Sequence, residues 1–238
     1  MLENKISHSY DGLGTFFEDY APMSVPDYQR GFDWNQSHVE ELWEDLHYYV
    51  EKELVREEEE FFVGTIILKS PSKDKDRYQI VDGQQRLTSI YLLAIVLRNR
   101  FKEIDTNTKR DVDTIFLNSY DYDDNRVPKF FGNQKIRDVL MHISDDKWDG
   151  INFPTRDDIG IDGRVLSPIN KKLKSCMKAH EDELDGNGSF EKKYDDNYEN
   201  FIVSIYVANN KETKTPIITI DKQTYSEEDI EKEIVKFL

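Results

Sequence analysis

The sequence predicts an α+β fold in which a β-sheet is flanked by helices and followed by a mostly helical C-terminal extension. Two β-prone runs, residues 61–68 and 77–81, are separated by a polar loop, as expected of neighbouring strands. Apolar residues recur every three or four positions in residues 37–50 and again after residue 86, which indicates amphipathic helices.

The first part of the chain is predicted to contain two helices around an extended segment. Residues 12–20 are predicted to form a short helix, and residues 23–26 an extended segment. Ser37 is a favourable N-cap, and Glu40 completes an S-x-x-E capping box, so the second helix is predicted to begin there. Its apolar positions are predicted to face the core: Val39, Leu42, Trp43, Leu46 and Val50.

Two strands and a long helix are predicted next. Residues 61–68 form a near-continuous apolar run, which suits a strand buried on both faces. Gly64 interrupts this run; a strand glycine usually marks a bulge, and it also lets backbone approach a ligand. Residues 77–81 are predicted to form the next strand, and the helix after it to run to about residue 103. Its predicted core face comprises Leu87, Ile90, Tyr91, Ala94, Leu97 and Phe101.

The chain changes in composition after residue 105. We predict a core domain over residues 1–105 and an α+β extension over residues 106–238 that packs on it. The acidic stretch at 121–125 lacks the glycine and the terminal glutamate of a calcium loop, so a solvated loop is predicted. The extension is predicted to contain helices at 134–143 and 167–184, strands at 201–207 and 217–220, and a final helix capped by Ser226.

Charge and cysteine content limit the functional classes. The chain has 32 Lys and Arg against 48 Asp and Glu, a net charge of −16, so it offers no global attraction to nucleic acid. Contact with DNA is expected only through a local patch or a partner. Cys176 is the single cysteine, no apolar run approaches membrane-spanning length, and the N-terminus lacks a signal-peptide core. These features predict a soluble cytoplasmic protein that does not bind membranes.

The most informative segment is D-G-Q-Q-R at residues 82–86, where a strand meets a helix. Asp82 is predicted to be the N-cap, with Gln85 three residues later imitating a capping box. Arg86 stands in the first turn, where a cation opposes the helix dipole, so it is suited to an external anion. The segment is a candidate phosphate pocket; the alternative is a turn that only connects two elements.

A second segment, residues 25–34, holds an aromatic, an amide and a guanidinium between Pro26 and Gly31. Arg30 can bind a phosphate through two parallel hydrogen bonds, or can form a surface ion pair that contributes little. The aromatic residues Tyr28, Phe32 and Trp34 can stack on a base, or can pack in the core.

Together these segments resemble a known family. The matching features are P-x-Y-Q-R at 26–30, Trp34, L-W-E-D-L at 42–46, F-x-G-x-I at 62–66 and I-V-D-G-Q-Q-R-L-T at 80–88. This pattern resembles the N-terminal domain of GmrSD-type modification-dependent restriction enzymes. The resemblance implies a mixed β-sheet similar to that of ParB and sulfiredoxin, and it is strongest over roughly the first hundred residues.

The resemblance also implies an activity. In that family the D-G-Q-Q-R motif is associated with binding and hydrolysis of nucleoside triphosphates, which controls DNA cleavage by a nuclease domain. The implied partners are a nucleoside triphosphate with Mg²⁺ and a nuclease domain or subunit, while self-association stays open. By motif position the catalytic residues would be Asp82, Gln85 and Arg86, and the nucleotide-binding residues Tyr28, Gln29, Arg30, Trp34, Gly83 and Gln84.

A mechanism follows as a hypothesis. Arg30 and Arg86 would hold the phosphates, and Gln85 or Gln84 would orient the attacking water. Asp82 would cap the helix or hold a magnesium ion through water. Two other functions stay open: a reader of modified DNA that does not hydrolyse nucleotides, and a catalytically silent interaction module.

Overall fold

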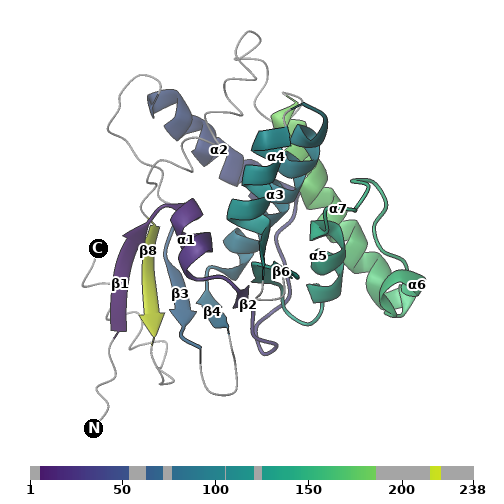
Figure 1. Ribbon diagram of the computed structural model, residues 1–238, viewed down its shortest axis with the longest axis horizontal. Helices are drawn as coiled ribbons and strands as arrows, with labels where there is room; N and C mark the ends of the chain where they lie inside the picture. Colours follow the sequence, from purple (N-terminus) through teal and green to yellow (C-terminus); the bar gives the residue numbers. More distant parts are fainter. Residues whose placement is uncertain are drawn as a thin grey trace.

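The computed structural model of the protein contains a sheet and a group of helices that gathers beside it (Figure 1). The residues it describes are 6–53, 63–71, 77–104, 106–120, 125–185 and 215–220. Predictions for residues 121–124, 201–207 and Ser226 onward lie outside these ranges. In the described part of the chain, no helix is both long enough and apolar enough to cross a membrane.

Among the described residues, the main sheet has six strands and is mixed, as predicted. β3 pairs in parallel with β8 and antiparallel with β4, whereas β1 pairs antiparallel with β8. Segments from both sides of residue 105 therefore share one sheet. The order across the sheet is β1 (Ile6–Asp11), β8 (Thr215–Ile220), β3 (Ile66–Lys69), β4 (Tyr78–Asp82), β2 (Met23–Ser24) and β7 (Phe130–Phe131).

Three neighbouring strands at one side of the sheet run parallel. β2 lies between β4 and β7, with Met23 opposite both Tyr78 and Phe130. Because parallel strands point the same way, their carboxyl ends meet at one edge of the sheet. The segments that leave these ends are consequently brought close together, although they are far apart in sequence.

The other described elements are mainly helices. Those after residue 105 fit the mostly helical extension that was predicted. β5 (Asn118–Tyr120) and β6 (Arg126–Pro128) form a small antiparallel pair. In Figure 1, α7 runs beside α3, and α1 lies over the sheet. The helices are α1 (Leu13–Asp19), α2 (Gln36–Glu53), α3 (Gln84–Ile104), α4 (Thr106–Val112), the π-helix η1 (Asp113–Leu117), α5 (Arg137–Ser144), α6 (Arg156–Ile159) and α7 (Gly163–Leu184).

Helix α3 is the centre of the core. Its predicted core face is confirmed, since the six residues assigned to it are all buried. Leu92 and Val96, on other sides of the helix, are also buried. A helix that is apolar on most sides is one covered by several neighbours, here including α4 and α7, so the one-sided prediction was incomplete.

A buried histidine joins three helices. The Trp43 indole of α2 donates a hydrogen bond to His180 Nδ1 of α7 at 2.8 Å, and His180 Nε2 lies 3.2 Å from Ser89 Oγ of α3. His180 is fully buried, and burial lowers its pKa to about 3. The ring is therefore neutral and links α2, α3 and α7 through both nitrogens.

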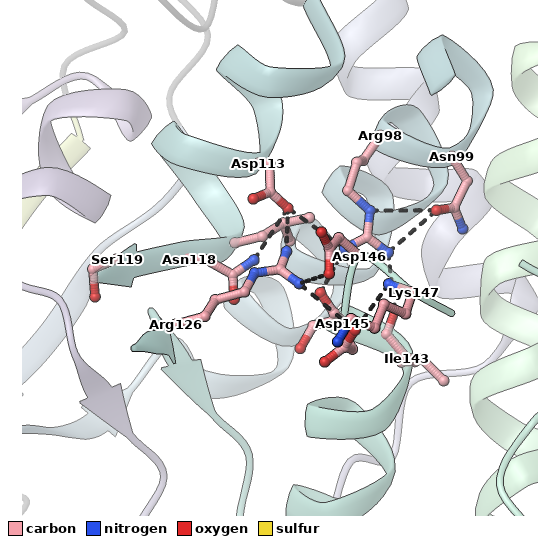
Figure 2. A network of polar contacts seen from close by, with 12 residues as sticks. Arg98, Asn99, Asp113, Asn118, Ser119, Arg126, Ile143, Asp145, Asp146 and Lys147 are labelled. Atoms are coloured by element: carbon pink, nitrogen blue, oxygen red, sulfur yellow. Dashed lines mark hydrogen bonds and ion pairs between the residues drawn. The ribbon is translucent and has the colours of Figure 1, made fainter. Parts of the chain in front are cut away.

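A charged network fixes α5 against α3 (Figure 2). Arg98 of α3 is 1% exposed and donates to the backbone carbonyls of Ile143 and Ser144 at the end of α5. Asp113 of η1 lies between Arg98 and Arg126 and pairs with both. A cation at a helix C-terminus satisfies carbonyls that lack intrahelical partners, so this network holds α5 in place.

Some boundaries differ from the predictions. The predicted cap at Ser37 is wrong: helix α2 begins at Gln36, and Asn35 Oδ1 accepts from the His38 backbone N–H at 3.4 Å. Asn35 precedes the helix directly, so its side chain reaches the first-turn N–H groups. Of the strand predicted over residues 61–68, residues 61 and 62 lie outside the described ranges and residues 63–65 are not in a strand, so β3 covers 66–69; β1 was not predicted.

Candidate functional site

The two sequence motifs meet at one cavity. The cavity is about 470 Å³ in volume and lies where β2 and β4 end. Every described residue that lines it comes from residues 25–34 or from the neighbourhood of D-G-Q-Q-R. The lining comprises Gln29, Arg30, Trp34, Val81, Asp82, Gly83, Gln84, Gln85 and Arg86.

Helix α3 begins at this cavity, one residue later than predicted. The Gly83 carbonyl accepts the first helical hydrogen bond, from the Leu87 N–H at 3.0 Å, so Gly83 is the N-cap. Asp82 ends strand β4 and is exposed, so the predicted Asp82 cap is wrong. Gly83 has φ of +85°, a conformation that glycine adopts without strain and a residue with Cβ does not. The first-turn N–H groups after Gly83 are thus available to an anion.

Arg86 holds the segment that leads into β3. Its Nη1 donates to the Val63 carbonyl at 2.7 Å, and its Nη2 donates to the Thr65 carbonyl at 2.9 Å. Between them, Gly64 has φ of +100°, and a Cβ there would lie 1.5 Å from Arg86 Nη1. Burial lowers the pKa of Arg86, and the nearby Asp82 carboxylate opposes that effect. Arg86 therefore supports the cavity wall as well as lining the cavity.

Gln85 is bonded to the other motif at both ends of its amide. Its Nε2 donates to the Gly31 carbonyl at 2.9 Å, and its Oε1 accepts from the Asp33 N–H at 2.8 Å and the Trp34 N–H at 3.4 Å. The predicted capping box is therefore wrong, because the Gln85 side chain reaches the loop after β2. Its side chain is buried and joins the two motifs.

Gln29 and Gln84 form a second link between the motifs. Gln29 Nε2 donates to the Val81 carbonyl at 2.9 Å, and Gln84 Nε2 lies 3.5 Å from Gln29 Oε1. In the described part of the chain, Gln84 Oε1 has no hydrogen-bond donor. Gln84 thus keeps a free acceptor at the cavity, in contrast to Gln85.

Arg30 presents a cation at the rim. Its side chain is exposed, and within the described ranges it forms no ion pair. The alternative role, a surface ion pair of Arg30, is therefore not observed among these residues. The Arg30 backbone is fixed nonetheless, because its carbonyl accepts from Asn133 Nδ2 at 3.0 Å.

The three aromatic residues of the first motif occupy different environments. Phe32 is 6% exposed and belongs to the core. Trp34 is half-buried, lines the cavity and stacks on His38 with ring centroids 5.8 Å apart. Tyr28 is 74% exposed and is not among the lining residues. Of the three, Trp34 alone is placed to contact a ligand in the cavity.

Further contributors come from residues after 105, which sequence reasoning did not assign to the site. Asn133 follows β7, and Lys172 and Cys176 belong to α7. Lys172 Nζ donates to the Phe32 carbonyl at 3.0 Å, and Cys176 Sγ lies 3.6 Å from the Trp34 carbonyl. A short apolar run followed by Gly-Asn at 132–133 is a turn signal, but nothing local reveals its distant partner.

The arrangement is chemically suited to an anion. Arg30, Arg86 and the amino end of α3 surround one cavity, and the helix dipole favours negative charge there. Asp82 contributes one exposed carboxylate. Mg²⁺ is commonly held by one or two carboxylates together with substrate phosphates, so this donor fits a nucleotide-bound magnesium ion.

Comparison with known protein families identifies the family of this chain. Residues 13–235 match the family described as GmrSD restriction endonuclease, N-terminal domain. The match covers most of the chain and extends beyond the first hundred residues, where the motif resemblance is strongest. A search of curated proteins gave no match. The function of the chain is thus related to DNA restriction, and the chain belongs to the family of GmrSD restriction endonuclease N-terminal domains.

Proposed function

We propose that this chain binds and hydrolyses a nucleoside triphosphate in the cavity between its two motifs, and that this activity regulates DNA restriction by a nuclease domain or partner. The observation that supports the proposal best is Arg30. It is an exposed cation without an ion pair in the described part of the chain, and it lines the same cavity as the start of α3. Phosphate groups match both features.

The binding role is divided among the lining residues. Arg30 would bind the phosphates, and the first-turn N–H groups of α3 would donate to them. Arg86 has two hydrogen bonds committed to the backbone, so it would add charge from a fixed position. Trp34 would contact the base. The exposed Tyr28 would take part only if the ligand extends beyond the cavity.

For hydrolysis, Gln84 is better placed than Gln85 to orient a water molecule. The Gln85 amide bonds three backbone groups, whereas Gln84 Oε1 is without a donor among the described residues. Phosphoryl transfer depends mostly on positioning and on stabilising charge, which suits an amide that holds water. Asp82 would hold Mg²⁺ through water, and the bound ion would neutralise phosphate charge.

The regulatory part of the proposal rests on family membership and on charge. The family is that of a restriction endonuclease, and this chain carries a net charge of −16. Such a charge disfavours nonspecific contact with DNA, so DNA would be engaged through a nuclease domain or subunit.

The test is a thermal-shift measurement with ATP, GTP, CTP and UTP, each with Mg²⁺. At a concentration about 100-fold above Kd, a nucleotide should stabilise the wild type by about 2.7 kcal/mol, and Arg30→Ala should lose most of that effect. Arg30 is preferable to Arg86 as the site of substitution, because Arg86→Ala would also remove two bonds to the backbone.

Arg110→Ala is the matched control, since Arg110 is an exposed arginine of α4 whose side chain is 73% exposed. It should respond to nucleotide as the wild type does. Absence of stabilisation by all four nucleotides would overturn the proposal, and binding to modified duplex DNA instead would favour the reader of modified DNA.

A further inference from the structure

Three parallel strands end beside the cavity, and only two of them carry the recognised motifs. The motifs follow β2 and β4, whereas β7 pairs with the other side of β2 and is followed directly by Gly132 and Asn133. Ligand sites of sheets with parallel strands commonly form where the carboxyl ends of those strands meet. The third strand end therefore places Asn133 beside the loop that carries Arg30.

Asn133 is held at both ends of its side-chain amide. It is 3% exposed; its Nδ2 donates to the Arg30 carbonyl at 3.0 Å, and its Oδ1 accepts from the Lys135 N–H at 3.2 Å. Its own carbonyl accepts from the N–H groups of Ile136 and Arg137, both at 3.0 Å. A buried amide with these partners has one conformation, so its bond to Arg30 fixes where that residue lies.

The neighbouring carbonyls of the loop have different partners. Gly31 O accepts from Gln85, and Phe32 O accepts from Lys172, at 2.9 and 3.0 Å. Within the described residues, the Arg30 carbonyl depends on Asn133 alone. We propose that Asn133 is a positioning residue of this site, which acts through Arg30 by holding its backbone so that the guanidinium faces the cavity. This inference rests on the proposed function, because it assigns a role at the same site.

Other contacts should keep the loop that carries Arg30 near α5 when Asn133 is replaced by alanine. Asp27 accepts from the Gln134 N–H and pairs with Arg137, each at 3.2 Å, and Arg98 holds the far end of α5. Asn133→Ala should therefore alter the direction of Arg30 more than the fold. Loss of one hydrogen bond of ordinary strength corresponds to an increase of about three- to tenfold in the Kd of a nucleotide.

The experiment is a double-mutant cycle of Asn133→Ala and Arg30→Ala, with Kd measured by calorimetry for ATP, GTP, CTP and UTP with Mg²⁺. Asn133→Ala should weaken binding about three- to tenfold in the wild-type background and leave binding unchanged in the Arg30→Ala background. Asn133→Asp, which keeps the acceptor for Lys135 but loses the donor, should behave like Asn133→Ala. Equal weakening in both backgrounds, or none in either, would overturn the inference.

A control and a second measurement separate this inference from the proposed function. Asn170→Ala removes a similar bond, Nδ2 to the Pro154 carbonyl at 2.8 Å, outside the cavity lining and should not change Kd. Hydrogen exchange of the amides at residues 31–34 should be faster in Asn133→Ala and unchanged in Asn170→Ala. If the wild type binds none of the four nucleotides, the proposed function fails. Unchanged hydrogen exchange at residues 31–34 in Asn133→Ala would then overturn the positioning role as well.

Discussion

At the scale of single residues, Gly64 decides where Arg86 can lie. The guanidinium occupies the space that a Cβ of residue 64 would fill, and it bonds the carbonyls on either side. The sequence alone marked Gly64 as an interruption in a strand and left bulge and close approach as alternatives. The structure shows a close approach, but by a side chain of the protein itself.

Gly64→Ala should therefore be more destabilising than backbone strain alone explains. We expect a loss of about 2–4 kcal/mol in the free energy of unfolding, because the positive φ is strained and both Arg86 hydrogen bonds are disturbed. Urea denaturation measures this loss. Gly160→Ala is the matched control: its φ is +72° with nothing within 4 Å, so only about 1 kcal/mol should be lost. Equal losses in the two variants would contradict this account of Arg86.

At the scale of elements, the junction of α2, α3 and α7 depends on a neutral histidine. Burial lowers the pKa of His180 to about 3 from its ordinary value of 6.5. Between these two pH values the unfolded chain binds a proton that the folded chain does not. The free energy of unfolding contributed by this group is thus fully present above pH 6.5 and is lost as the pH falls through that window.

The prediction concerns the slope of stability against pH. Between about pH 7 and about pH 5.5, the free energy of unfolding of the wild type should fall. His180 should contribute to this fall with a slope that approaches about 1.4 kcal/mol per pH unit, and His180→Gln should lack that contribution. Urea denaturation at several pH values gives both slopes. His180→Gln reports the slope of the remaining groups, and Asn170→Ala, which removes no ionisable group, should keep the wild-type slope. Parallel slopes in wild type and His180→Gln would show that the histidine is not neutral by burial.

Elements with local signals were predictable from the sequence. The strand before Asp82 and the helix after Gly83 follow from a β-prone run, a turn glycine and helical spacing, and both were found within a residue or two. The start of α3 was misjudged by one residue, because Asp82 is a good cap by type while the backbone conformation there requires glycine.

The parts of the site that could not be predicted are those made by distant contacts. Gln85 was assigned to catalysis by its motif, yet its amide bonds to the backbone at residues 31–34, about fifty positions away. Asn133 and Lys172 lie more than a hundred positions from the loop they hold. Such pairings depend on strand order and on helix packing, which residue types and spacing do not encode locally.

At the scale of the whole molecule, the site draws on residues from both sides of position 105. That boundary stays a prediction, and a fragment of residues 1–105 tests it. The fragment keeps both motifs but lacks β7, Asn133, α7 and β8. It should show no cooperative thermal transition, because α3 would expose the apolar side that α7 covers and β2 would lose a neighbour. A fragment that melts cooperatively and binds nucleotide would support the boundary instead.

The position of β8 has a consequence for the synthesis of the protein. This strand lies between β1 and β3, yet β1 ends at Asp11 and β8 begins at Thr215. While the chain emerges from the ribosome, β1 and one edge of β3 lack their partner strand β8. Such unpaired edges pair readily with other chains. Ribosome stalling before residue 215 would therefore release an aggregation-prone intermediate, and chaperone demand should be greatest just before β8 emerges.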